Sequence, residues 1–188
     1  LADGPGGVSN VANISLAITA VNDAPTATTT ASDPTFTEGG SAVTLFSSTA
    51  ISPVEASQRI DQIVFRVLNV GNGSSERLRI DGTDVALTNG NTVSTVTNGL
   101  SISVAYNSGT ADVTISSAAG LTAAAANSIV NGMTYANDSK APVGTSRSVV
   151  LVSVRDNGGG SNTTNVGTTS AVTLVAVNDA PTLAGGPY

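Results

Sequence analysis

The sequence predicts an all-β sandwich with one short helix. Valine and threonine are abundant, and Asn-Gly pairs at 89–90 and 98–99 separate short apolar runs. β-branched residues favour strands, and Asn-Gly favours hairpin turns. The chain has three Phe, three Tyr and no Trp, so the core must be built mainly from Val, Ile, Leu and Ala.

Period-two alternation predicts strands that bury one face. In residues 77–80, for example, Leu78 and Ile80 point inward if Arg77 and Arg79 point outward. Similar alternation occurs at 13–21, 102–106 and 113–115. Nearly continuous apolar runs predict central strands covered on both faces, and they occur at 63–70 and 149–154. We expect about eight to ten strands.

Residues 121–132 break the strand pattern and predict a short helix. Thr122 is a candidate N-cap, four alanines follow it, and Gly132 is a candidate stop. An apolar stripe with a spacing of four is formed by Leu121, Ala125, Ile129 and Met133. We expect this stripe to cover one end of the sandwich core.

A long internal repeat predicts the domain boundaries. The frame of an Asp, a Gly-rich loop, a strand and Val-Asn-Asp-Ala-Pro occurs at 3–26 and again at 156–182. The two linker motifs are 156 positions apart, because Asn22 corresponds to Asn178. One complete repeat is therefore predicted at 24–179, preceded at 1–23 by the last strand and linker of another repeat. Residues 180–188 would begin the next repeat of a tandem array.

The charge balance favours a cation as partner. Thirteen acidic against seven basic residues give a net charge of -6, so nucleic acid and anionic membrane are poor partners. Cysteine is absent, which leaves hard-cation binding through oxygen as the available metal chemistry. No run approaches the roughly 20 apolar residues of a membrane span, so we expect a soluble fragment without direct membrane insertion, whose export signal lies elsewhere.

The linker motif carries a family resemblance. Val-Asn-Asp-Ala-Pro at 21–25 and 177–181, followed by Phe-Thr-Glu-Gly at 36–39, resembles the cadherin-like repeats of giant RTX-type bacterial adhesins, which are exported by type I secretion. Weaker similarity covers 35–43, 78–83, 86–91 and 133–137. The resemblance implies an Ig-like β-sandwich, bound Ca²⁺, neighbouring repeats as partners, and an extracellular place on the bacterial surface.

The resemblance also implies which residues bind calcium. Asp23 would bind the ion at the N-terminal junction with Glu38 and Glu55, assisted by Asn22. The C-terminal counterpart would be formed by Asp156, Asn178 and Asp179. Calcium takes six to eight oxygen ligands, and mixed carboxylate, amide and carbonyl oxygens at a Gly-rich loop such as 156–160 suit it.

Simpler interpretations of these residues stay open. Asp23 and Asp179 could form turns before Ala-Pro, Asp156 could open a hairpin, and Glu38 could be a surface carboxylate at a strand end. Asp81, Asp84 and Asp112 are expected in turns or at strand starts, and the arginines in solvated cross-strand pairs. Proline at 25 and 181 predicts stiff linkers.

The residues favour a mechanical function over a catalytic one. Histidine and cysteine are absent, no G-x-S-x-G or P-loop occurs, and the carboxylates are scattered. Sugar-cleaving sites need two carboxylates, but they are normally surrounded by aromatics. We therefore expect a non-enzymatic, monomeric, calcium-stabilised extender repeat that acts as a stiff spacer in cell adhesion or biofilm attachment. The alternative is a ligand-binding module for a glycan or for an identical repeat.

Overall fold

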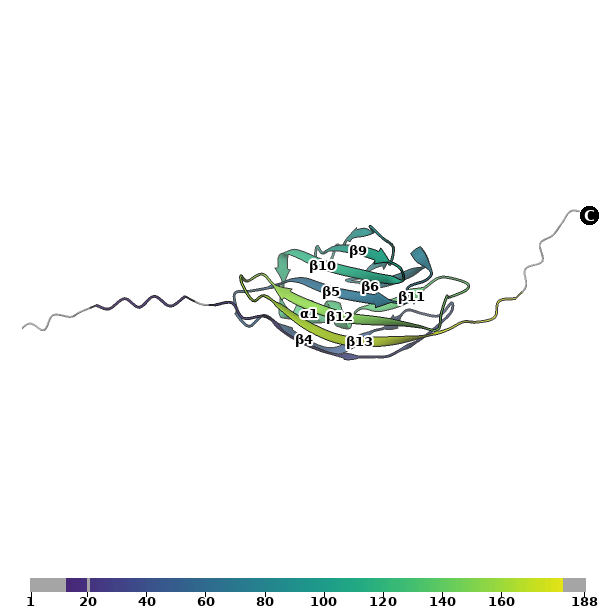
Figure 1. Ribbon diagram of the computed structural model, residues 1–188, viewed down its shortest axis with the longest axis horizontal. Helices are drawn as coiled ribbons and strands as arrows, with labels where there is room; N and C mark the ends of the chain where they lie inside the picture. Colours follow the sequence, from purple (N-terminus) through teal and green to yellow (C-terminus); the bar gives the residue numbers. More distant parts are fainter. Residues whose placement is uncertain (1–12, 20, 181–188) are drawn as a thin grey trace, which may run out of the picture.

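The computed structural model describes residues 13–19 and 21–180 and confirms the predicted all-β sandwich with one short helix (Figure 1). The first strands are β1 (Thr26–Ala31), β2 (Thr35–Thr37), β3 (Val43–Thr44), β4 (Phe46–Ser52) and β5 (Ile60–Leu68). A 3₁₀ turn at Gly73–Ser75 leads to β6 (Glu76–Ile80), β7 (Thr83–Ala86), β8 (Thr92–Ser94), β9 (Ser101–Asn107) and β10 (Thr110–Leu121). The helix α1 (Ala123–Asn131) then precedes β11 (Thr134–Asn137), β12 (Ser146–Asp156) and β13 (Thr163–Val175).

The strands form two facing layers around one apolar core. One layer is a seven-stranded sheet in the order β2-β13-β12-β5-β10-β9-β8. The other contains the β1-β4 ribbon, α1 and the four-stranded sheet β3-β11-β6-β7 (Figure 1). The described chain has 13 strands, more than expected, and two of the additional strands arise because the segments 26–37 and 43–52 are each divided between two sheets. Their halves are β1 and β2, and β3 and β4.

The long apolar runs form central strands, but they are not covered on both faces as predicted. In β5, Ile63, Phe65 and Val67 are fully buried, whereas the residues between them are half-buried or exposed. β12 has the same one-sided pattern over most of its length. The outward side chains of these two strands are therefore only partly covered.

The predicted caps of α1 are confirmed, but the expected position of the helix is wrong. The Thr122 hydroxyl accepts a hydrogen bond from the Ala125 amide at 3.1 Å, and Gly132 ends the helix. The helix lies along β4 and not across one end of the core. Its Asn127 and Asn131 side chains accept the β4 amides of Ile51 at 2.7 Å and Thr49 at 3.0 Å. These amides face α1 because β4 pairs with β1 on its other edge.

A buried polar cluster was not predicted. Glu76 and Arg147 are both 0% exposed and form an ion pair through Glu76 Oε1. The same carboxylate accepts the Tyr135 hydroxyl at 2.6 Å and the amides of Gly71 at 2.7 Å and Asn72 at 2.8 Å. Every charge in the cluster is therefore paired, which is the condition for tolerating it in the core. It ties the loop after β5 to the starts of β6 and β12.

The chain enters and leaves the sandwich at opposite ends of its long axis (Figure 1). β2 pairs in parallel with the end of β13. The strands of the seven-stranded sheet that come first and last in the sequence therefore run in the same direction. The described tail 13–19 forms no strand, contrary to the alternation at 13–21, and Ile14, Leu16 and Ile18 are 91%, 81% and 85% exposed. No helix of the described chain is long and apolar enough to cross a membrane.

The buried cluster predicts acid sensitivity. Burial alone would raise the pKa of Glu76, but the hydrogen bonds from Arg147, Tyr135, Asn72 and Gly71 outweigh it and hold that pKa below the ordinary 4.5. As the pH falls, the Glu76 carboxylate therefore takes up a proton in the unfolded chain before it does so in the folded protein. The stability that Glu76 contributes is fully present above about pH 4.5 and is lost as the pH falls further, through the lower pKa of the folded state.

Glu76→Gln should lower the free energy of unfolding at neutral pH by about 3 to 5 kcal/mol, because it leaves Arg147 buried without a counter-charge. Urea unfolding from pH 3 to pH 7 measures this difference as a function of pH. We expect the gap between wild type and variant to narrow below about pH 4.5, where the wild type loses the same interaction. A gap that does not change with pH would contradict this assignment.

Candidate functional site

The linker before β1 is held on the N-terminal end of the sandwich. Asn22 is half-buried there; its amide nitrogen donates to the Ser161 carbonyl at 2.7 Å, and its amide oxygen accepts from the Gln58 side chain. Pro25 is buried, and its carbonyl accepts from the Thr164 hydroxyl. The linker is therefore docked onto the loops before β5 and after β12.

Glu55 lies at this end, as predicted. Its Oε1 atom accepts the backbone amide of Asp23 at 2.9 Å. The Asp23 residue itself is exposed, so its carboxylate is free to face a ligand or solvent. Glu55 comes from the β4–β5 loop, where the Gln58 amide donates to its carbonyl at 3.0 Å and closes a turn.

Asp156 also lies at the N-terminal end, which corrects its predicted place at the C-terminal junction. It is the last residue of β12 and is opposite Ile60 at the start of β5, and it is 0% exposed. Its Oδ1 atom accepts the Gly158 amide at 2.9 Å. The next residue, Asn157, exchanges two hydrogen bonds with the Arg59 backbone, each 2.9 Å long. Because β12 runs antiparallel to β5 and β13, its end meets the start of the repeat.

Three buried oxygen atoms at the N-terminal end have no hydrogen-bond partner. They are Glu55 Oε2, Gln58 Oε1 and Asp156 Oδ2. A hollow of about 540 Å³ at this end is lined by Val21, Asn22, Glu55, Ser57, Gln58 and Gly159. Buried acceptors without donors are costly in free energy, and a cation is the kind of partner that oxygen atoms alone can bind.

Glu38 lies at the opposite end of the molecule, which corrects its predicted place beside Asp23. It follows β2, and its backbone amide donates to the Val175 carbonyl at 2.8 Å. Its Oε2 atom accepts the Val177 amide at 3.0 Å. The residue is 8% exposed, and its Oε1 atom is buried without a partner. Parallel pairing with β13 carries Glu38 to the C-terminal end.

Asn178 and Asp179 continue from this contact as exposed chain. Their only hydrogen bond within the described residues is a local one, from the Asn178 side chain to the Asp179 carbonyl at 3.3 Å. Their counterparts Asn22 and Asp23 are, by contrast, docked on loops of the repeat that follows them. The C-terminal linker thus has Glu38 behind it and no equivalent docking surface ahead of it in the described chain.

Neither junction gathers a complete metal site by itself. Among residues 13–19 and 21–180, no three His, Cys, Asp or Glu side chains lie close enough together to hold a metal ion. The predicted ligands are therefore divided. Asn22, Asp23, Glu55 and Asp156 lie at the N-terminal end, and Glu38, Asn178 and Asp179 lie at the C-terminal end.

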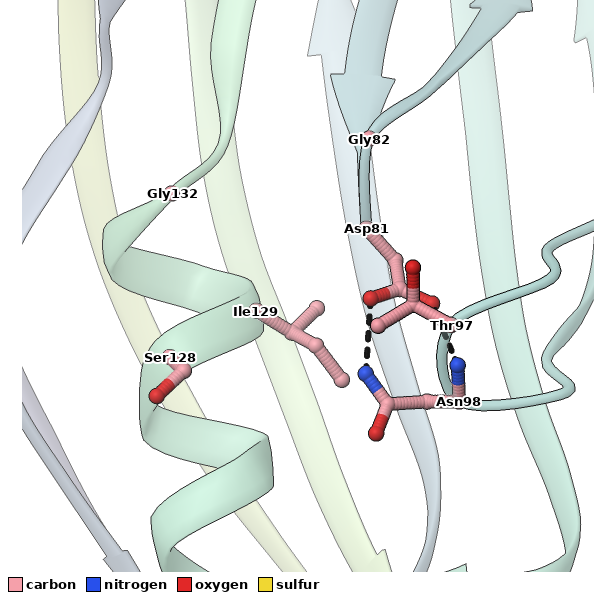
Figure 2. A pocket seen from close by; sticks show the side chains of 7 residues that line it. All are labelled: Asp81, Gly82, Thr97, Asn98, Ser128, Ile129 and Gly132. Atoms are coloured by element: carbon pink, nitrogen blue, oxygen red, sulfur yellow. Dashed lines mark hydrogen bonds between the residues drawn. The ribbon is translucent and has the colours of Figure 1, made fainter.

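A separate hollow of about 330 Å³ lies between α1 and the β6–β7 turn (Figure 2). Asp81 projects into it from the turn and accepts the Thr95 hydroxyl at 2.6 Å, the Asn98 amide at 3.0 Å and the Asn98 side chain at 2.6 Å. Its positive φ of 50° confirms the predicted turn. These hydrogen bonds join the β6–β7 turn of one layer to the β8–β9 turn of the other. The Asp81 carboxylate is already surrounded by donors, so its role here is structural.

Sequence reasoning missed several junction residues. Gln58 and Ser161 lie in loops with no pattern of their own, and only the fold brings them to Asn22. Asn157 could have been found, because Asx residues beside glycine often bond to nearby backbone. Cross-strand pairing of the arginines was predicted, but the partners were not named. Arg66 pairs with Asp112 across β5 and β10, and Arg79 pairs with Asp84 across β6 and β7.

Comparisons with known proteins identify no relative. No family model, no curated protein and no solved structure matches this chain.

Gly158 should control the docking of the N-terminal linker. A Cβ atom at this position would lie 1.8 Å from Asn22 Oδ1 and 2.7 Å from Gln58 Nε2, whereas one at Gly159 would meet nothing within 4 Å. Gly158→Ala should therefore displace Asn22 and release the Asp23 amide from Glu55. We expect hydrogen exchange at the Asp23 amide to accelerate at least about fivefold, the effect of losing one hydrogen bond.

Gly159→Ala is the matched control and should leave exchange at the Asp23 amide unchanged. Equal exchange rates in the two variants would show that the contact between Asn22 and the loop after β12 does not hold the linker.

Proposed function

We propose that this chain is a non-catalytic, calcium-stabilised extender repeat of a secreted bacterial surface adhesin. In this role the sandwich is a stiff spacer in a tandem array, and Ca²⁺ at its ends fixes the angle between neighbouring repeats. The array would hold a distal binding domain away from the cell in adhesion or biofilm attachment. The partners are the ion and the adjoining repeats of the same chain.

The observation that carries the proposal is the set of buried carboxylate oxygens without partners beside the two linkers. Glu55 Oε2 and Asp156 Oδ2 lie at the N-terminal end, and Glu38 Oε1 lies at the C-terminal end. Calcium binds carboxylate, amide and carbonyl oxygens in flexible arrangements. An ion at each linker would supply the positive charge that these atoms lack.

The 156-residue periodicity suggests how the two half-sites become one. Asn178 and Asp179 correspond to Asn22 and Asp23, so a following repeat would receive them as this repeat receives its own linker. A complete junction would then combine Glu38 of one repeat, the linker Asn-Asp pair, and the residues equivalent to Glu55 and Asp156 in the next repeat. The set would then contain four carboxylates and two amide side chains, from the linker Asn and Gln58, and only a tandem pair would add Glu38 to the others.

The exposed N-terminal tail also supports an array. With the same 156-residue offset, Leu16 and Ile18 correspond to Val172 and Leu174. Those two residues are 0% and 7% exposed in β13, whereas Leu16 and Ile18 are 81% and 85% exposed. An apolar stripe of this kind needs a sheet to cover it, and the remainder of a preceding repeat would provide one.

The glycan-binding alternative has weaker support. Among the described residues, Tyr106 is the only aromatic side chain that is not buried. It lines a hollow with Asn89, Asn107 and Asp112, which offers hydrogen-bonding groups but a single ring. Sugar sites usually present a larger aromatic surface.

Calcium binding is best tested on two copies of residues 24–179 joined in tandem and preceded by residues 13–23. An ion present at about 100 times its dissociation constant adds about 2.7 kcal/mol. We therefore expect chelation to lower the melting temperature by roughly 5 to 10 °C. Small-angle scattering should show a longer, less flexible particle with calcium than with chelator.

Glu55→Gln with Asp156→Asn in the second copy should abolish the calcium-dependent shift at the junction. Asp112→Asn is the control, because Asp112 pairs with Arg66 in the middle of a sheet. Identical melting and scattering with and without calcium in the wild-type tandem would refute the calcium proposal.

A further inference from the structure

The terminal strands are arranged so that tension between neighbouring repeats would shear them. The chain enters at one end of the long axis and leaves at the other (Figure 1). β2 and β13 are parallel partners, with Thr35, Phe36 and Thr37 opposite Thr173, Leu174 and Val175. Pulling β2 from its N-terminal side and β13 from its C-terminal side moves the strands along each other. All hydrogen bonds between them are then strained together instead of one after another.

Two carboxylates lengthen this short pairing, one beyond each end of β2. The Asp33 carboxylate accepts the Ala171 amide at 2.8 Å, and the Pro34 carbonyl accepts the Thr173 amide at 2.9 Å. Past the other end of β2, the Glu38 amide and carboxylate bond to β13 and its extension, at 2.8 Å to Val175 and 3.0 Å to Val177. The three-residue pairing is thereby extended, so that the segment 33–38 is bonded along the stretch 171–177 of the outgoing chain.

The core anchors this pairing. Phe36 is 1% exposed, and its ring meets Tyr135 edge-on with centroids 5.6 Å apart. Tyr135 is held in turn by the buried carboxylate of Glu76. On the other edge of β13, the Leu174 amide donates to the Thr145 carbonyl at 2.8 Å. Sliding β2 past β13 would therefore also withdraw an aromatic ring from a paired position.

The N-terminal ribbon carries the same pull before β2 does, and its pairing is irregular. β1 pairs with β4, but its register shifts between Thr28 and Thr30. If β1 separates, the force passes through Asp33 and Pro34 directly into β2. The bonds between 33–38 and 171–177 then join the two segments that carry the tension.

We propose that β2, β13 and the Asp33 and Glu38 carboxylates form a mechanical clamp, which sets how fast the repeat unfolds under tension. Its importance in a surface array depends on the extender function proposed above, but the clamp itself needs no ion. Glu38 closes its C-terminal end through Oε2 and presents Oε1 to the linker. An ion at the C-terminal junction would therefore add to the resistance of the clamp.

The test is constant-force unfolding of the full chain, held by its two ends, in the presence of chelator. Glu38→Ala removes the acceptor for the Val177 amide, and Val177→Pro removes the donor. Each variant should unfold about fivefold faster than wild type under force, the effect of one lost hydrogen bond. The double variant should be no faster than either single variant, because both remove the same bond.

Two controls separate the clamp from general stability and from calcium. Glu38→Gln keeps a side-chain oxygen for Val177 and should unfold under force at the wild-type rate. Thr95→Val removes the hydroxyl that bonds Asp81 and Leu100, beside β8 at the opposite edge of the same sheet. It should lower the melting temperature without changing the rate under force.

Wild-type unfolding rates for Glu38→Ala and Val177→Pro, or equal acceleration by Thr95→Val, would overturn the clamp. Acceleration by Glu38→Gln equal to that by Glu38→Ala would also overturn it, because the hydrogen bond to Val177 would not be the cause. The calcium proposal is judged separately, by repeating the force measurement with calcium on the two tandem copies described above, in which the junction between repeats is complete. If the ion has no effect while the variants behave as expected, the clamp stands and the calcium junction fails.

Discussion

The parallel pairing of β2 with β13 is the constraint on which the rest of the arrangement depends. It places β2 and β13, which come first and last in the sequence among the strands of the large sheet, side by side in the same direction. The chain must therefore leave at the end opposite to its entrance. The same pairing carries Glu38 to the outgoing linker and, through the antiparallel return of β12, leaves Asp156 beside the incoming one. The division of the candidate ligands between two ends follows from this topology.

The interior combines thin apolar layers with one buried polar cluster, whose members each need their partners. Small aliphatic side chains fill most of the core, and a few aromatic rings join its parts. Glu76, Arg147 and Tyr135 fix the loops at the C-terminal end, where Phe36 also packs. Removing one member would leave a buried charge or hydroxyl without its partner, so the end at which the chain leaves the sandwich is held by specific, mutually dependent contacts.

The sequence was sufficient for the elements whose signals are local. Alternation identified the inward residues of β6, β9 and β10, and Thr122 and Gly132 marked the limits of α1. Glu38 and Asp156 were assigned to the wrong ends, because their positions depend on which strands pair and in which direction. Arg147 could not be recognised as buried, since only Glu76, more than 70 positions away, makes its burial tolerable. Long-range pairing has no local signature.

The two linker motifs have a consequence for how a tandem array of this kind would lengthen. In the tandem array proposed above, each end of the sandwich would present a different half of a contact. The two halves would meet across the five-residue frame that occurs at 21–25 and again at 177–181. In such an array, a duplication or deletion with its breakpoints in these two segments would change the length of the protein by one unit and regenerate the same contact. The distance that the array spans could then change by recombination alone, without any new interface between repeats having to arise.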